Sequence, residues 1–348
     1  MEATDTAHIP SSGAPLPAAA FPDGGPVTAG YLPGAEGFPL VLRPASAGVD
    51  LSAWAAEHRE LIYKSLTAHG ALLFRGFDLK TPDDFERAVT GIYPQLFGGY
   101  GDLPREGVSD KIYKSTPYPA NQAILFHNES SHLPRWPLKQ FFFCVQASET
   151  GGETPLLDCR EIAKALDPAL FQRFADKGLM YVRNFCEDID VSWQDLFKTK
   201  DKKEVERICH EGGMTCEWVK GRTLRIKQQA RAVARHPVTK EIVFFNQVQL
   251  HHPYCLDPAT RKSLVALFKE EGLPRNVYYG DGSKIEDSTM ETLGKLFWER
   301  CKSFPWLNGD LIMLDNMLIS HARKPFTGAR KIVVAMGEMV EGKDLPPL

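Results

Sequence analysis

The stretch AILFHNESSHLPRWPLKQFFFCVQASETGGETPLLD, residues 123–158, decides how the rest of the chain is interpreted. It places a histidine and a carboxylate two residues apart, His127 and Glu129, directly after the apolar run 123–126. On a β-strand, residues i and i+2 project from the same face. One imidazole nitrogen and one carboxylate oxygen can therefore hold a single cation, and this pairing of N and O ligands suits a non-haem Fe(II) site.

A second histidine–acid pair shows how weak this pattern is by itself. With ten histidines and 44 acidic residues, chance predicts about one such pair in the chain. His58 and Glu60 lie in residues 54–68, whose apolar spacing predicts an amphipathic helix. Residues i and i+2 of a helix point about 200° apart, so these two side chains cannot share an ion. The pair at 127 and 129 therefore needs a third ligand elsewhere in the chain.

Composition is that of an ordinary globular protein. The 348 residues are 43% hydrophobic and 24% charged, which is enough to bury a large core. A net charge of −3 without a long basic block argues against nucleic acid or an anionic membrane surface as partner. No apolar run is long enough for a membrane span, and no secretory signal is recognisable at the start. Seven dispersed cysteines without a C-x-x-C favour reduced thiols in a cytoplasm.

The order of apolar runs and turn residues predicts the domain organisation. Residues 1–35, rich in Pro, Ala, Gly and Ser, are expected to be a flexible tail, and residues 36–348 a single domain. Helices are expected at 54–68 and 81–92, and as insertions near 160–215 and 257–302. Strands are expected near 38–42, 71–77, 123–127, 139–147, 154–157, 223–226, 232–234, 242–246, 311–315 and 331–336.

Many strands at irregular spacing, with helices between them, predict a mainly β fold with helical insertions (α+β). Its expected core is a double-stranded β-helix, or jelly roll. The strand at 311–315 is followed by His321 and, nine residues later, by Arg330. Jelly-roll pairings are non-local, so His321 can lie beside His127 although 194 residues separate them.

In combination, these motifs resemble the taurine dioxygenase (TauD/TfdA-like) family of Fe(II)- and 2-oxoglutarate-dependent oxygenases. The resemblance is carried by His127-x-Glu129, by Gly-Gly-x-Thr ending at Thr154, by the distant His321 and by Arg330. The segments STPYPANQAILFHNESSH and GDGSKI are most similar to the hydroxylases found with nonribosomal peptide synthetases, typified by the syringomycin aspartyl hydroxylase. The similarity extends from about residue 38 to the C-terminus.

The resemblance implies a role for each of these residues. His127, Glu129 and His321 become the Fe(II) ligands, which agrees with the chemistry, since two imidazoles and one carboxylate on one face leave positions open for co-substrate and O2. Thr154 and Arg330 are implied to bind the distal carboxylate of 2-oxoglutarate. A guanidinium fork matches a carboxylate, and the threonine hydroxyl adds a further donor.

Other polar residues are weaker candidates. Ser131 shares the strand face of the two ligands if that strand continues, and Asn246 ends a predicted core strand. Both are candidates for substrate contacts, although structural hydrogen bonding explains them equally well. His251 and His252 are adjacent, so on a strand they would face opposite ways and are poor metal ligands.

The resemblance also implies the reaction: 2-oxoglutarate and O2 are consumed, succinate and CO2 form, and an sp3 carbon is hydroxylated. Related halogenases lack the carboxylate ligand, so Glu129 favours hydroxylation, with desaturation and epoxidation left open. Val334 and Ala123 stand where the taurine enzyme has an arginine and an asparagine, so taurine is not expected. An amino acid, free or tethered to a carrier protein, is the expected substrate, in antibiotic or other natural-product biosynthesis.

Two alternatives of other classes remain. One is a jelly-roll protein that binds a metal or ligand without turnover. The other is an interaction module of a synthetase assembly, whose helical insertions dock a carrier domain. The sequence leaves homo-oligomer formation open.

Overall fold

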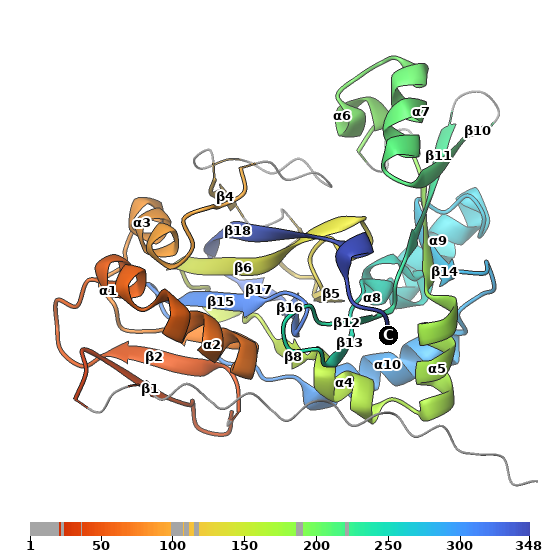
Figure 1. Ribbon diagram of the computed structural model, residues 1–348. Helices are drawn as coiled ribbons and strands as arrows, with labels where there is room; N and C mark the ends of the chain where they lie inside the picture. The colour runs from red at the N-terminus through yellow and green to blue at the C-terminus, as the bar shows by residue number, and fades with distance from the viewer. Residues whose placement is uncertain are drawn as a thin grey trace, which may run out of the picture.

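The largest sheet has seven strands in the order β1-β2-β3-β15-β6-β18-β4 (Figure 1). The computed structural model describes residues 21, 24–35, 37–98, 107, 111–114, 118–185, 191–219 and 223–348. The strand bounds are β1 Val27–Gly30, β2 Leu40–Pro44, β3 Ala71–Phe74, β4 Tyr113–Lys114, β6 Arg135–Gln146, β15 Leu311–Asp315 and β18 Lys331–Glu341. The central strands alternate between the first and last parts of the chain, which is the non-local pairing expected of a jelly roll.

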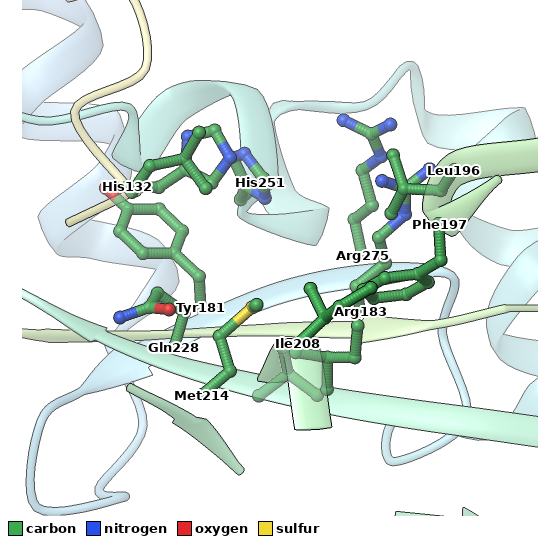
Figure 2. A pocket seen from close by; sticks show the side chains of 13 residues that line it. His132, Tyr181, Arg183, Leu196, Phe197, Ile208, Met214, Gln228, His251 and Arg275 are labelled. Atoms are coloured by element: carbon green, nitrogen blue, oxygen red, sulfur yellow. The ribbon is translucent and has the colours of Figure 1, made fainter. Parts of the chain in front are cut away.

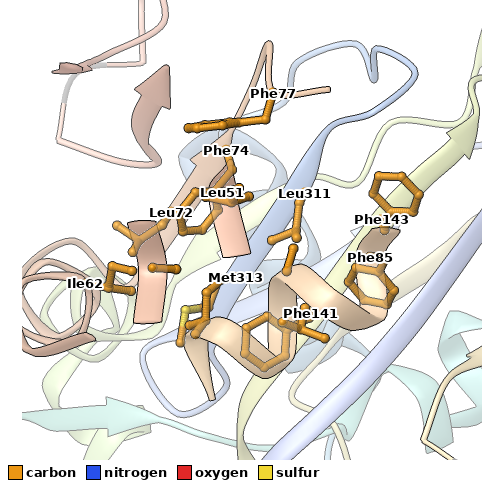
Figure 3. Close-up of a cluster of buried hydrophobic side chains, with 14 of the residues drawn as sticks. Leu51, Ile62, Leu72, Phe74, Phe77, Phe85, Phe141, Phe143, Leu311 and Met313 are labelled. Carbon is orange, nitrogen blue, oxygen red and sulfur yellow. The ribbon is translucent and has the colours of Figure 1, made fainter. Parts of the chain in front are cut away.

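Three helices, α1 (Leu51–Glu57), α2 (Arg59–His69) and α3 (Pro82–Ile92), cover one face of this sheet. Apolar side chains from these helices and from the sheet form a buried cluster, in which the rings of Phe85 on α3 and Phe143 on β6 stack at 5.3 Å (Figure 3). The predicted helix 54–68 is broken at His58, whose Nδ1 bonds the Trp54 carbonyl at 2.8 Å.

The other face of the large sheet packs against smaller sheets. One has the order β5-β16-β8, with β5 Ile124–His127, β16 Ile319–Arg323 and β8 Leu156–Asp158. Two-stranded pairs are formed by β7 (Thr150–Gly151) with β17 (Phe326–Thr327), and by β12 (Val233–Arg235) with β13 (Ile242–Phe244). A second apolar cluster fills the space between the sheets. The layers form a jelly-roll core, as predicted, without closing into a barrel.

The two regions in which helical insertions were predicted hold helices and, between them, strands. They contain α4 Cys159–Ala165, α5 Pro168–Lys177, α6 Trp193–Phe197, α7 Lys202–Glu211, α9 Pro258–Phe268 and α10 Asp287–Arg300. They also contain strands β9 (Leu179–Asn184) and β14 (Arg275–Tyr279). These strands join β10 (Met214–Val219) and β11 (Thr223–Ala230) in a sheet of order β10-β11-β9-β14. Aromatic and β-branched residues of β9 and β14, such as Tyr181 and Val277, are buried in a third apolar cluster.

The structure of residues 27–30 also differs from the prediction. Val27–Gly30, inside the predicted tail 1–35, forms β1 and pairs antiparallel with β2. Val27 is buried in the first apolar cluster, which gives this segment a reason to be ordered. Residues 1–20 lie outside the described residues, and the assignment of one domain to 36–348 stays a prediction. Among the described helices, none has the length and apolar character needed to cross a lipid bilayer.

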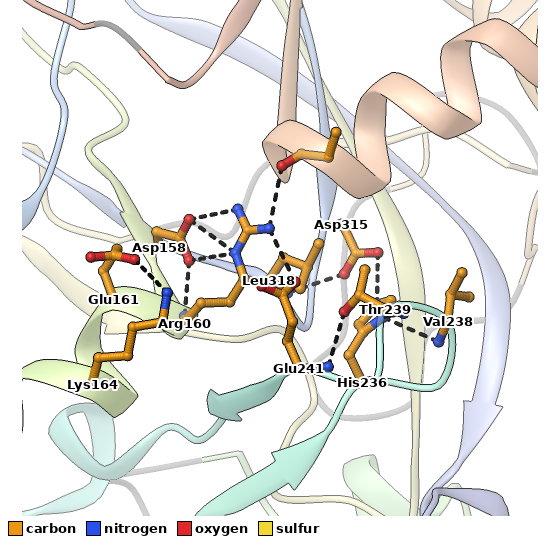
Figure 4. Close-up of polar contacts among 11 residues, drawn as sticks. Asp158, Arg160, Glu161, Lys164, His236, Val238, Thr239, Glu241, Asp315 and Leu318 are labelled. Atoms are coloured by element: carbon orange, nitrogen blue, oxygen red, sulfur yellow. Dashed lines mark hydrogen bonds and ion pairs between the residues drawn. The ribbon is translucent and has the colours of Figure 1, made fainter. Parts of the chain in front are cut away.

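Buried polar contacts fix the turn between β15 and β16 (Figure 4). Asp315 accepts hydrogen bonds from the backbone N–H groups of Met317 and Leu318 through Oδ1, and its Oδ2 lies 3.0 Å from Nε2 of His236. Nearby, Arg160 donates to both carboxylate oxygens of Asp158, the last residue of β8. These contacts fix the backbone of the turn, which starts at Asp315, six residues before His321.

Candidate active site

The structure brings together the three residues predicted to bind iron. His127 ends β5 and His321 lies on β16, and the two residues are direct partners in the antiparallel register, with ring centroids 4.2 Å apart. Glu129 lies two residues beyond the end of β5. One potential ligand atom from each of the three side chains lies within 4.8 Å of the others. This compact set of two imidazoles and one carboxylate fits the donor preference of Fe(II).

The surroundings of these side chains also fit a cation. Glu129 is buried and accepts a hydrogen bond from Nε2 of Gln140 at 3.2 Å. Burial raises the pKa of Glu129 to about 7, so a cation beside it would restore the ionised form. Nδ1 of His127 lies 2.8 Å from the Leu125 carbonyl. That contact selects the tautomer in which Nε2 of His127 carries the lone pair that a metal needs.

A buried asparagine, Asn316, holds the carboxylate segment against the β15–β16 turn. Its Oδ1 accepts from the Glu129 N–H at 2.7 Å, and its Nδ2 donates to the carbonyls of Glu129 and Pro137, each at 2.9 Å. Asn128 returns a bond from Nδ2 to the Asn316 carbonyl at 2.7 Å. The segment that carries Glu129 is thereby fixed to the chain that leads to His321.

Thr154 and Arg330, predicted to bind 2-oxoglutarate, line the same cavity as the three ligand candidates. Nε1 of Trp306 donates to the Thr154 hydroxyl oxygen at 3.1 Å, which leaves the hydroxyl proton of Thr154 to be donated elsewhere. Arg330 donates from Nε to the Gly152 carbonyl at 2.9 Å. Burial, with the positive charge of Arg323, lowers the pKa of Arg330 to about 10, so an anion in the cavity would stabilise the guanidinium.

The Gly-Gly-x-Thr motif has a steric reason. Gly152 has φ +71°, and a Cβ at this position would lie 3.0 Å from Cδ of Arg330. A larger residue would therefore be strained and would displace the arginine. The turn brings Thr154 and Arg330 to one wall of the cavity. The remaining lining residues are Ile124, Gln140, Phe142, Ala322, Arg323, Ile332 and Val334.

The two candidate substrate residues lie elsewhere. β5 ends at His127, so the strand does not continue to Ser131, and the premise for that candidate is wrong. The Ser131 hydroxyl donates to the Asn128 carbonyl at 2.9 Å. The Asn246 carbonyl accepts from the Asn128 N–H, the Asn246 N–H donates to Oδ1 of Asn128, and Nδ2 of Asn246 donates to the Ala232 carbonyl. Neither residue is among the described residues that line the cavity, and both have structural hydrogen bonds.

Sequence reasoning did not identify Gln140, Trp306 or Asn316, the three side chains that orient the candidate site. Asn316 directly follows Asp315 at the end of an apolar strand, which is a signal for a turn. Gln140 and Trp306 carry no such signal, because their role depends on contacts over 11 and 152 residues of sequence.

Comparisons with known proteins agree with this geometry. A family model described as "Taurine catabolism dioxygenase TauD, TfdA family" matches residues 34–336. The dapdiamide synthesis protein DdaC of Enterobacter agglomerans is 36% identical over 272 residues, covering 78% of this chain and 83% of that protein. A clavaminate synthase-like protein of Arabidopsis thaliana is 28% identical over 318 residues, covering 86% of this chain and 93% of that protein.

Solved structures support the fold. PvcB, described as an Fe, alpha-ketoglutarate dependent oxygenase, superposes with a TM-score of 0.57 at 14% identity, covering 93% of this chain and 97% of PvcB. A second structure of PvcB, from Pseudomonas aeruginosa, also has a TM-score of 0.57. The predicted resemblance and the predicted fold class are thus confirmed. The family acts on small-molecule substrates. From the family match and the identity with DdaC, the chain belongs to the TauD/TfdA family and is a 2-oxoglutarate-dependent dioxygenase that uses Fe(II), 2-oxoglutarate and O2.

Proposed function

We propose that this dioxygenase hydroxylates an sp3 carbon of an amino acid, or of an aminoacyl group on a carrier protein, in natural-product biosynthesis. The observation that carries the proposal is the carboxylate of Glu129 within 4.8 Å of the ligand atoms of His127 and His321. A site with all three protein ligands offers no vacant protein position for a halide, which favours hydroxylation. The identity with DdaC, a dapdiamide synthesis protein, supports a biosynthetic role.

In this proposal, His127, Glu129 and His321 hold Fe(II), and Thr154 and Arg330 hold the distal carboxylate of 2-oxoglutarate. Bound Fe(II) supplies the activation of O2 that oxidises a C–H bond while 2-oxoglutarate becomes succinate and CO2. Neighbouring groups of the protein fix the two side chains that hold 2-oxoglutarate. The Thr154 hydroxyl is oriented by Trp306, and the Arg330 side chain is held by the Gly152 carbonyl.

The test is a screen of free amino acids and their carrier-bound or small-molecule thioesters with the Fe(II)-loaded enzyme. We expect one class to cause succinate formation together with a product heavier by one oxygen atom, labelled when ¹⁸O2 is supplied. Glu129→Ala should abolish both signals, whereas Glu57→Gln, on the exposed face of α1, should keep them.

Other outcomes would contradict the proposal. A product lighter by two hydrogen atoms would show desaturation, and oxygen gain only with substrates that contain a double bond would show epoxidation. Absence of substrate-dependent succinate across the screen would favour a protein that binds the metal without turnover.

A further inference from the structure

A residue that the sequence did not single out, Arg323, lines the same cavity as the three candidate iron ligands. This iron-site cavity differs from the cavity of about 290 Å³ between the four-stranded sheet and the helices α6 and α7 (Figure 2). Among the described residues, none lines both cavities. The charge of Arg323 must therefore be explained by its own neighbours and by what binds in the iron-site cavity.

The strand register places Arg323 opposite Thr154. Arg323 is the last residue of β16, so it points to the same face as His321, two residues earlier. The ladder between β16 and β8 continues to this position, because the backbone N–H groups on either side of Arg323 donate to the carbonyls on either side of Thr154, at 3.0 and 3.1 Å. Arg323 and Thr154 are therefore a non-hydrogen-bonded pair, whose Cβ atoms lie about 4.5–5.5 Å apart.

The guanidinium group of Arg323 has a donor that the protein does not use. Nη1 donates to the Tyr118 carbonyl at 3.1 Å, and Nη2 donates to the carbonyls of Pro119 and Gln122, each at 2.6 Å. These contacts tie the 118–122 segment to the cavity wall. Nε is buried and has no hydrogen-bond partner in the described part of the chain, although the whole side chain is only 8% exposed. A buried N–H group without a partner favours an acceptor from a bound molecule.

Arg323 and Arg330 face one aromatic ring. Their guanidinium carbons lie 5.1 and 5.5 Å from the centroid of the Phe326 ring. After burial, the positive charge of Arg323 is the largest cause of the lowered pKa of Arg330, whereas Glu153, which opposes the shift, is the smallest. Among the described residues, no carboxylate forms an ion pair with either arginine. The two cations repel each other, and a bound anion would remove this repulsion.

We propose that Arg323 is a second arginine for the co-substrate, with Nε donating to the distal carboxylate of 2-oxoglutarate together with Thr154 and Arg330. A carboxylate offers about four lone-pair sites, so it can accept from two guanidinium groups and a hydroxyl. The Nη groups stay bound to the 118–122 segment, so one side chain positions both that segment and the co-substrate. The proposal rests on the proposed function, which assigns the distal carboxylate to Thr154 and Arg330.

Two matched ligands test this contact without turnover. They are 2-oxoglutarate and 2-oxopentanoate, which keeps the 2-oxo acid end but has a methyl group in place of the distal carboxylate. The Fe(II)-loaded enzyme is titrated with 2-oxoglutarate by calorimetry under nitrogen, and the dissociation constant of 2-oxopentanoate is obtained by competition. The ratio of the dissociation constant of 2-oxopentanoate to that of 2-oxoglutarate measures the contribution of the distal carboxylate.

We expect Arg323→Met to weaken the binding of 2-oxoglutarate about tenfold or more, the effect of losing a charge-assisted hydrogen bond. The dissociation constant of 2-oxopentanoate should change by less than about twofold, which also shows that the variant is folded. Arg323→Lys keeps the charge but loses the guanidinium fork, so it should lose part of the ratio. If Arg323→Met does not fold, Arg323→Lys decides the outcome alone.

Lys324→Met is the matched control. Lys324 follows Arg323 in the chain, so its side chain points to the other face of the ladder, and its removal changes the net charge equally. This variant should keep the wild-type ratio. The proposal is overturned if the Arg323 variants also keep that ratio, or if they weaken both ligands by the same factor. The second result would leave Arg323 with a purely structural role at the 118–122 segment.

Arg330→Met separates this proposal from the proposed function. A low ratio in Arg330→Met with a wild-type ratio in Arg323→Met would reject the second arginine and keep the co-substrate assignment. A wild-type ratio in Arg330→Met with a low ratio in Arg323→Met would support the contact of Arg323 and reject the role proposed for Arg330.

Discussion

Glu129 is a buried carboxylate, and its ionisation in the absence of a metal is unfavourable. Desolvation is the main cause of its raised pKa, and the hydrogen bond from Gln140 opposes it only in part. A metal between Glu129 and the two histidines would offset that desolvation. Glu129 therefore lowers the stability of the metal-free protein and raises that of the metal-bound protein.

The stability of the metal-free protein should depend on pH through Glu129. The pKa of Glu129 is about 7 in the folded protein and 4.5 in its ordinary state, so the folded protein prefers the protonated form. Below pH 4.5 the group is protonated in both states and has no effect. As pH rises toward 7, the free energy of unfolding falls by up to about 3 kcal/mol. Urea unfolding of chelator-treated protein at pH 5 and pH 8 measures the change.

Glu129→Gln should remove this component, so that the metal-free variant becomes more stable than the wild type at pH 8 but not at pH 5. Glu57→Gln, exposed on α1, serves as the control and should follow the wild type. Equal pH dependence of wild type and Glu129→Gln would show that the carboxylate is not desolvated.

Arg330 should control the affinity for 2-oxoglutarate. Arg330→Met removes the guanidinium fork, and we expect the KM for 2-oxoglutarate to rise about 30- to 100-fold, which corresponds to roughly 2–3 kcal/mol. The measurement is the initial rate of succinate formation against 2-oxoglutarate concentration. Lys331→Met, at the exposed neighbouring position, should leave the KM unchanged, and an unchanged KM in Arg330→Met would reject the assignment.

The three candidate iron ligands could be named from the sequence, because the resemblance to the TauD/TfdA family adds the distant His321 to the local pattern of His127 and Glu129. The residues that contact the substrate could not be predicted in the same way. Ser131 was placed by assuming that the strand continued, whereas Ser130 adopts φ +57° and the chain turns after His127. That turn is stabilised by Asn316, 187 residues away from Glu129, and no local pattern reports such a contact.

At the scale of elements, the turn between β15 and β16 connects the two halves of the candidate iron site. It carries Asp315, which fixes its own backbone, and Asn316, which fixes the backbone of Glu129. His321 follows on β16 in direct register with His127. A change in this turn should therefore alter the relative position of ligands that it does not itself supply.

Asn316→Ala should weaken metal binding without removing a ligand. We expect the Fe(II) affinity to fall about 10- to 100-fold, the usual effect of losing an outer-sphere contact. The free energy of unfolding should fall by roughly 2–4 kcal/mol because buried backbone groups lose their partners. Asn308→Ala removes one exposed bond to the Ala147 N–H and is the control. Unchanged Fe(II) affinity, measured by competition with a chelator, would contradict this role.

The inserted sheet shows where element prediction fails. Residues 160–215 and 257–302 contain clear helix signals, and the helices exist, but β9 and β14 lie between them. Each of these strands has six residues or fewer and pairs with a partner far along the chain. Short apolar runs fit a strand or a buried helix equally well until the partner is known.

For the whole molecule, the large sheet separates two apolar clusters. One is covered by α1–α3, and the other lies between the sheets, next to the iron site. The mainly β class and the jelly-roll core could be predicted because strand-like runs are frequent. The order β3-β15-β6-β18 could not, since its pairings join distant parts of the chain, such as Leu311 with Phe74 and Leu311 with Phe143. The cluster beneath the helices is expected to determine stability without touching the chemistry.

Phe143→Ala tests this separation. Removing a fully buried ring that stacks on Phe85 should lower the free energy of unfolding by about 3–5 kcal/mol. The KM for 2-oxoglutarate should stay within about twofold at a temperature where the variant is folded. Leu267→Ala, at a side chain that is 72% exposed, should change stability by less than about 0.5 kcal/mol. A large rise in KM for Phe143→Ala would show that the two clusters are coupled.

The pairing of His127 with His321 has a consequence for the nascent polypeptide. At about 5–20 residues per second, a ribosome needs on the order of 10–40 s to proceed from one histidine codon to the other. Throughout that interval the first histidine and its neighbouring acid have no opposite strand, and an arriving ion would meet an incomplete set of donors. A complete set of three donors for iron can therefore form only after His321 has been translated.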